Sequence, residues 1–126
     1  ILNIPMGYMW SPIDARAGTN NWLSSIPAGT KVVIIDDVID TGATLISTAN
    51  ELRKKGLHVV GAICIFSYEI ESVRQKLIEN DIHYRMLTSF EALSLVGVQT
   101  GRITYEEYLK TLEYQKNPYK GFFNEQ

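Results

Sequence analysis

Residues 32–44 read Val32-Val33-Ile34-Ile35-Asp36-Asp37-Val38-Ile39-Asp40-Thr41-Gly42-Ala43-Thr44, and this stretch decides the fold that we predict. The four β-branched residues at its start are typical of a strand buried on both faces, as in a parallel sheet. Two adjacent carboxylates follow the run, and helix-forming residues begin at Leu45. Residues 41–44 are therefore predicted to form a turn between a strand and a helix.

This turn is a candidate anion site. The first N–H groups of a helix have no partner inside the helix, and its N-terminus carries a partial positive charge. The carboxylates of Asp36 and Asp37 lie beside the turn and suit hydroxyl groups or Mg²⁺. We therefore predict a ligand that carries both a phosphate and a hydroxyl-rich group, such as a ribose with Mg²⁺.

The composition is typical of one soluble globular domain, and we predict a single domain over residues 1–126. A net charge of −2 gives no electrostatic reason to expect nucleic acid or an anionic membrane, and no apolar run is long enough to span a bilayer. The single cysteine, Cys64, excludes a disulfide framework and favours a reducing, cytoplasmic setting. The chain opens at Ile1 without an initiator methionine, so we expect the domain to be incomplete at its N-terminus.

Strands and helices alternate along the predicted chain, which indicates an α/β fold with a parallel sheet and right-handed crossovers. The predicted strands cover Ile4–Trp10, the run that ends before Asp40, His58–Phe66 and, nearer a sheet edge, Ile82–Leu87. The first predicted helix runs from Thr44 or Leu45 to Lys55, before Gly56, and the second lies within residues 67–80 with Val73, Leu77 and Ile78 inward. Capping boxes open two further helices, one from Thr88 to about Val96 and one from Thr104 to about Gln115. Residues 11–30 show no sustained period and are predicted to be a functional lid or a mobile segment. Ligands of such sheets bind at the carboxyl ends of the strands, where residues 36–44 lie.

Residues 32–44 resemble the phosphoribosyl-pyrophosphate motif of type I phosphoribosyltransferases. That motif has four apolar residues, two acids, two apolar residues, a variable one, then Thr-Gly, a small residue and Ser or Thr, and every position fits. The alternative is a buried strand that ends in a solvated Asp-Asp turn. Residues 2–8, 62–69, 82–93 and 103–109 are in turn similar to bacterial orotate phosphoribosyltransferases, mostly to their C-terminal half.

The resemblance implies a role for each motif residue. Asp36 and Asp37 would bind the ribose hydroxyls, directly or through Mg²⁺, and Asp40 to Thr44 would wrap the 5′-phosphate. The implied ligand-binding set is Asp36, Asp37, Val38, Asp40, Thr41, Gly42, Ala43 and Thr44. The resemblance further implies that a base nitrogen displaces pyrophosphate at the anomeric carbon through an oxocarbenium-like transition state, that Tyr68 lies on the base side, and that the protein is a homodimer.

Three features depart from the family pattern. The stretch 13–21 lacks the lysines and the histidine of the family's mobile loop, and its only cation, Arg16, is either a catalytic substitute or a solvated side chain. Asp40 stands where orotate enzymes usually carry Thr or Ser; as in purine enzymes it would act on the base, or it would cap the following helix. The family's N-terminal hood and its pyrophosphate loop lie before the point at which this chain starts.

These observations leave three hypotheses open. The first is an orotate phosphoribosyltransferase with Asp36, Asp37, Asp40 and Arg16 as catalytic residues. The second is a purine enzyme of the same fold, and the third is a catalytically silent phosphoribosyl- or nucleotide-binding module. His58 and His83 have no partner at ligand spacing, so we predict no structural metal site. The aromatic residues of the C-terminal segment are expected to be core or dimer-interface residues.

Overall fold

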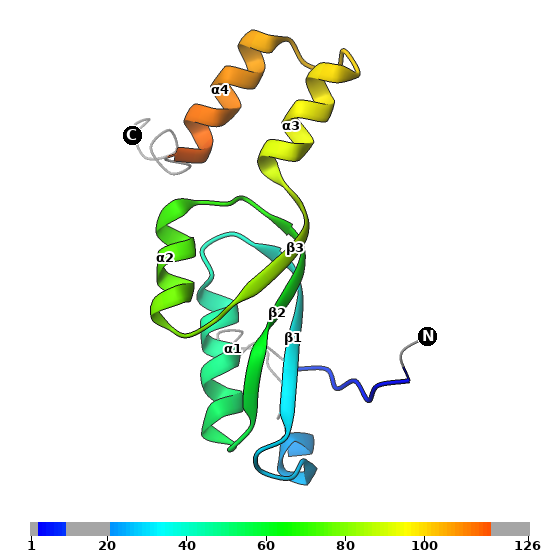
Figure 1. Ribbon diagram of the computed structural model, residues 1–126, viewed down its shortest axis with the longest axis vertical. Coiled ribbons are helices and arrows are strands. Elements are labelled where there is room, and N and C mark those ends of the chain that lie inside the picture. The colour runs from blue at the N-terminus through cyan, green and yellow to red at the C-terminus, as the bar shows by residue number, and fades with distance from the viewer. Residues whose placement is uncertain (1–2, 10–20, 117–126) are drawn as a thin grey trace.

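A computed structural model describes residues 3–9 and 21–116 of the chain. Its elements are the 3-10 helix η1 (Asn21–Ser25), β1 (Lys31–Ile39), α1 (Ala43–Lys54), β2 (His58–Ser67), α2 (Glu71–Glu79), β3 (Tyr84–Ser89), α3 (Phe90–Gln99) and α4 (Tyr105–Lys116) (Figure 1). The three strands form one sheet in the order β1-β2-β3, and both pairings are parallel. The predicted α/β class is therefore confirmed.

Helices cover one face of this sheet. Because the strand order advances in a single direction, two right-handed crossovers place α1 and α2 on the same side, as Figure 1 shows. Their apolar faces pack on the inward side chains of β2. The core formed in this way includes Val59, Ala62, Cys64, Leu45, Ala49, Leu52, Val73 and Leu77.

The prediction that the strands are buried on both faces is wrong for the described residues. Val33 is 50% exposed and Ile35 is 69% exposed, and on β2 the side chain of Ile63 is 42% exposed. Ile35 lies opposite Ile63 in the β1–β2 register, so these residues share one face. A second layer over this face would need a crossover in the opposite direction, and no described helix supplies one.

Three further predictions are wrong in detail. Residues 4–9 form no strand, because this segment extends away from β1 and pairs with no described strand (Figure 1); Trp10 lies outside the described residues. Ile78 is 50% exposed although we predicted it inward. The third helix is capped by Ser89, whose Oγ accepts a hydrogen bond from the N–H of Ala92, so it begins one residue later than predicted.

The end of α1 and the start of α4 confirm the sequence patterns, whereas α1 begins at Ala43, before the predicted Thr44 or Leu45, and α3 extends to Gln99 rather than to about Val96. α1 ends before Gly56, whose φ of +79° is the left-handed conformation expected there. Thr104 and Glu107 form the predicted capping box of α4: the N–H of Thr104 donates to Glu107 Oε2 at 2.7 Å, and the N–H of Glu107 donates to Thr104 Oγ1 at 3.1 Å.

The predicted connection before β1 is only partly described. Its second half contains η1, which buries Leu23, while residues 11–20, with Arg16, lie outside the described residues, as does the segment after Lys116. Within residues 3–9 and 21–116, no helix has the length and apolar character needed to cross a bilayer.

Candidate functional site

A pocket of about 170 Å³ lies where the carboxyl end of β1 turns into α1. Its lining residues are Asp36, Asp37, Val38, Ile39, Asp40, Gly42, Thr44 and Leu45. Six of them belong to the ligand-binding set predicted from the sequence. The other two, Ile39 and Leu45, have buried side chains, and only their places in the strand-turn-helix pattern could have pointed to them. Thr41 and Ala43 belong to the same turn without lining the pocket.

The two acidic residues lie within β1 and differ in environment. Successive strand residues point to opposite faces of a sheet. Asp36 pairs in register with the buried Cys64, so it lies on the helix-covered side and is half-buried, whereas Asp37 is exposed. The N–H of Asp37 donates to Asp36 Oδ1 at 3.0 Å, and the N–H of Val38 donates to Asp37 Oδ1 at 2.8 Å. Both carboxylates are thus oriented by the backbone of the strand itself.

Burial raises the pKa of the Asp36 carboxyl above its ordinary value, and the negative charges of Asp37 and Asp40 add to this rise. The hydrogen bond from the N–H of Asp37 opposes the rise without cancelling it. A site that concentrates negative charge in this way is suited to a metal ion or to a developing cation.

The turn after β1 leaves the start of α1 open to an anion. Gly42 is the N-cap residue, with φ of +73°, and no side chain of the described residues caps this helix. The N–H of Ala43 lies at 3.4 Å from Thr41 Oγ1, which is a weak hydrogen bond. The first N–H groups of α1 are therefore available to an oxyanion such as a phosphate.

Two features favour a glycine at position 42. The positive φ is one that L side chains rarely adopt. A Cβ at this position would also lie 3.2 Å from Val73 Cγ1 and 3.3 Å from Leu77 Cδ2, both on α2. The turn consequently packs directly on α2, which fixes its position relative to the sheet.

Asp40 orders the turn but does not cap the helix. Its Oδ1 accepts hydrogen bonds from the N–H of Thr41 and, at 3.3 Å, from Thr41 Oγ1. Because Gly42 is the N-cap residue, the interpretation of Asp40 as the cap of α1 is wrong. Its carboxylate is exposed and lines the pocket, as a role toward the substrate would require.

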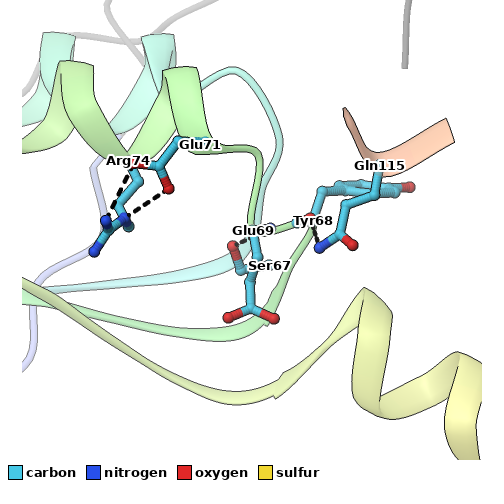
Figure 2. A network of polar contacts seen from close by, with 6 residues as sticks. All are labelled: Ser67, Tyr68, Glu69, Glu71, Arg74 and Gln115. Carbon is cyan, nitrogen blue, oxygen red and sulfur yellow. Dashed lines mark hydrogen bonds and ion pairs between the residues drawn. The ribbon is translucent and has the colours of Figure 1, made fainter. Parts of the chain in front are cut away.

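Tyr68 lies next to the site although it does not line the pocket. It follows β2, and its N–H donates to the carbonyl of Ile39 at 3.2 Å. Ile39 is the residue directly before Asp40 in the sequence. Its ring packs between those of Phe66, at a centroid distance of 5.1 Å, and Phe90, at 5.5 Å. Gln115 on α4 reaches its carbonyl, as Figure 2 shows.

Two charged side chains at the start of α2 pair with each other. Arg74 on α2 forms an ion pair with Glu71, with Nε 3.0 Å from Oε2, and this pair is drawn in Figure 2.

Arg16, the predicted catalytic cation, lies outside the described residues. The described part of the chain contains no group of three or more His, Cys, Asp and Glu side chains that could hold a metal ion by themselves. A pair such as Asp36 and Asp37 fits Mg²⁺, which binds through one or two carboxylates together with substrate oxygens.

Comparison with known proteins agrees with this geometry. The family model described as the phosphoribosyl transferase domain matches residues 10–101. The chain is similar to orotate phosphoribosyltransferases of Bacillus cytotoxicus, at 32% identity, and Bacillus mycoides, at 33%; each match spans 117 residues, 93% of this chain and 56% of the relative. The chain thus spans about half the length of these curated relatives.

A solved structure shares the fold. The UMP synthase of Leishmania donovani matches with a TM-score of 0.57 at 20% identity, over 71% of this chain and 20% of that one. The family model matches most of the chain, and Asp36, Asp37 and Gly42 stand at the motif positions of a strand-turn-helix site. This chain therefore belongs to the phosphoribosyl transferase domain family.

Proposed function

We propose that this chain binds phosphoribosyl pyrophosphate and transfers its phosphoribosyl group to a free base, orotate. The observation that carries the proposal is the pocket in which an acidic pair adjoins an uncapped helix N-terminus. Such a pocket suits a ligand with a phosphate at one end and hydroxyl groups at the other. The choice of orotate rests on the likeness to the two Bacillus relatives.

In this proposal the pocket and the turn beside it each bind one part of the ligand. The N–H groups of residues 42–44 and the hydroxyls of Thr41 and Thr44 bind the 5′-phosphate. Asp36 and Asp37 bind the ribose hydroxyls and hold Mg²⁺. When bound, Mg²⁺ would neutralise charge on the pyrophosphate.

The reaction is a substitution at the anomeric carbon of the ribose. The bond to the pyrophosphate oxygen breaks, a bond to a ring nitrogen of the base forms, and pyrophosphate leaves. Positive charge develops on the ribose in the transition state, and in this proposal the carboxylates of Asp36, Asp37 and Asp40 stabilise it. Holding the ribose phosphate still accounts for much of the remaining acceleration.

One observation supports a purine as the second candidate base. The exposed carboxylate of Asp40 lines the pocket and is free of the helix cap, so it is able to accept a hydrogen bond from a base nitrogen. The lack of lysine and histidine in residues 13–21 instead supports a silent binding module. The homodimer, the cytoplasmic setting and a catalytic role for Arg16 remain predictions.

Asp37→Asn tests the ligand. This substitution keeps the shape of the side chain and removes its charge, so we expect the affinity for phosphoribosyl pyrophosphate with Mg²⁺ to fall by about 10- to 100-fold, the range for hydrogen bonds to a charged group. Isothermal titration calorimetry measures the change. Asp81→Asn is the control, because Asp81 is an exposed residue between α2 and β3 and lies outside the pocket. Unchanged affinity in Asp37→Asn would refute the assignment of the pocket.

Pyrophosphate release tests the base. The wild-type chain is assayed with phosphoribosyl pyrophosphate, Mg²⁺ and orotate, and in parallel with hypoxanthine and guanine. Turnover with orotate supports the proposal, and turnover with only the purines replaces orotate by the second candidate. Tight binding of phosphoribosyl pyrophosphate without turnover on any base identifies the silent module.

A further inference from the structure

The loop that joins β2 to α2 is held from two sides at the carboxyl edge of the sheet. Glu69 in this loop adopts φ of +51°, a conformation that a residue with a side chain rarely takes unless its surroundings impose it. On the near side, the N–H of Glu69 donates to the buried Ser67 Oγ at 3.1 Å. The loop is therefore strained and needs contacts that keep it in place.

The contact on the far side comes from the C-terminal helix. Gln115 on α4 donates from Nε2 to the carbonyl of Tyr68 at 3.0 Å, across 47 positions of sequence, and Figure 2 shows its side chain reaching the loop. A row of aromatic rings reinforces this contact. The ring centroids of Tyr114 and Phe90 are 6.0 Å apart, and those of Phe90 and Tyr68 are 5.5 Å apart. Figure 1 shows α3 and α4 beyond the carboxyl ends of the strands, where these contacts are made.

The same loop is joined to the candidate site through the backbone. The N–H of Tyr68 donates to the carbonyl of Ile39 at 3.2 Å, and Ile39 lines the pocket directly before Asp40. One residue of the loop thus accepts a hydrogen bond from α4 and donates one to the end of β1. A single backbone hydrogen bond therefore places the loop beside the pocket, while the turn that follows β1 is held by its own contacts with α2.

We propose that Gln115 is a positioning residue: it holds the 67–69 loop next to the pocket, on the side where the family resemblance implies that the base binds. The effect of Gln115 on the binding of the base rests on the proposed function, whereas its contact with the loop does not. The proposal assigns to α4 a role that is separate from binding of the ribose phosphate. Loss of the Gln115 donor should therefore weaken the binding of the base and leave the affinity for phosphoribosyl pyrophosphate nearly unchanged.

The test uses three variants of the full chain. Gln115→Glu keeps the shape of the side chain but has no N–H donor, and Gln115→Lys restores a donor. Gln75→Glu is the matched control, because it makes the same Gln-to-Glu change at an exposed position of α2. There, Gln75 Nε2 makes only a long hydrogen bond of 3.4 Å to Glu79 Oε1. Hydrogen exchange of the amides of residues 67–70, the KM for the base and the affinity for phosphoribosyl pyrophosphate are measured for each.

We expect Gln115→Glu to speed exchange in the loop and to raise the KM for the base, each by about 5-fold, the factor that corresponds to one net hydrogen bond. kcat and the affinity for phosphoribosyl pyrophosphate should change by less than about 2-fold, Gln115→Lys should recover most of the loss, and Gln75→Glu should match the wild type.

Two results would overturn the inference: loop exchange that is unaffected by Gln115→Glu, or faster exchange with an unchanged KM for the base. If the wild-type chain turns over no base, the proposed function fails instead. The exchange data then still decide whether Gln115 holds the loop, so the two failures are told apart.

Discussion

At the scale of single residues, Asp36 shows how the demands of folding and of the proposed site oppose each other. Its carboxylate lies on the helix-covered side of β1, beside the buried Cys64 and close to two other acids. This environment raises the pKa of Asp36, which means that the folded chain favours its protonated form. The fold makes this carboxylate costly to ionise, whereas the proposed ligand needs its charge.

The raised pKa of Asp36 predicts how stability depends on pH. A carboxyl whose pKa is higher in the folded than in the unfolded chain stabilises the fold at low pH. This contribution is lost as the pH rises from 3.8, the ordinary pKa of the carboxyl, through its raised pKa in the folded chain. Asp36→Asn should therefore increase the free energy of unfolding at pH 7, and the gain should disappear below pH 3.8.

Urea denaturation followed at a series of pH values measures this difference. The control is Asp81→Asn, an exposed aspartate 4.0 Å from Arg53, which should show no gain at pH 7. Asp36→Asn should at the same time lose affinity for phosphoribosyl pyrophosphate. A variant that is less stable than the wild type at neutral pH would contradict this account of Asp36.

At the scale of elements, the site depends on how α1 begins. The turn needs a residue that tolerates φ of +73° and leaves room for Val73 and Leu77 of α2. Gly42 meets both conditions. The side-chain hydrogen bonds of the turn stay within the turn, so its packing on α2 is a contact that ties it to the rest of the fold.

Gly42→Ala should separate these two conditions when it is compared with Gly101→Ala. Gly101 has a similar φ of +69°, and no heavy atom lies within 4 Å of the place that an alanine Cβ would take, so alanine there should cost only the backbone term of about 1–2 kcal/mol. Alanine at position 42 should cost roughly 1 kcal/mol more, because it also presses on α2.

Thermal and urea unfolding give the stabilities of both variants, and calorimetry gives their affinities for phosphoribosyl pyrophosphate. Only the change at position 42 should weaken the affinity. Equal effects of the two substitutions on binding would show that the turn is not part of the site.

At the scale of the whole molecule, the sheet has one covered face and one open face among the described residues. Neighbouring residues on β2 show the difference: Val59 is 8% exposed under the helices, and Val60 is 50% exposed on the other side. The stability of the chain should therefore come mainly from the layer between β2 and the helices α1 and α2.

Val59→Ala and Val60→Ala make a matched pair for this expectation. Both remove the same atoms and lower strand propensity equally, but only the first leaves a cavity in the core. We expect Val59→Ala to lower the free energy of unfolding by about 2 kcal/mol and Val60→Ala by roughly a third of that. Equal losses in urea denaturation would show that the open face is covered in solution.

The sequence by itself determined the local features of this protein. A β-branched run, an acidic pair and a glycine specified the strand, the turn and the start of α1, and the Thr104–Glu107 pattern specified the start of α4. These features are predictable because each depends on residues within a few positions of one another.

Only the tertiary structure decided what depends on distant residues. The direction in which the strands advance put both crossover helices on one face and left Ile35 on the other, contrary to the pattern of its own strand. The packing of Gly42 on α2 and the contact of Gln115 with Tyr68 join segments that lie far apart in the sequence. No local pattern encodes such pairings, because they follow from how the elements pack rather than from the residues that form each element.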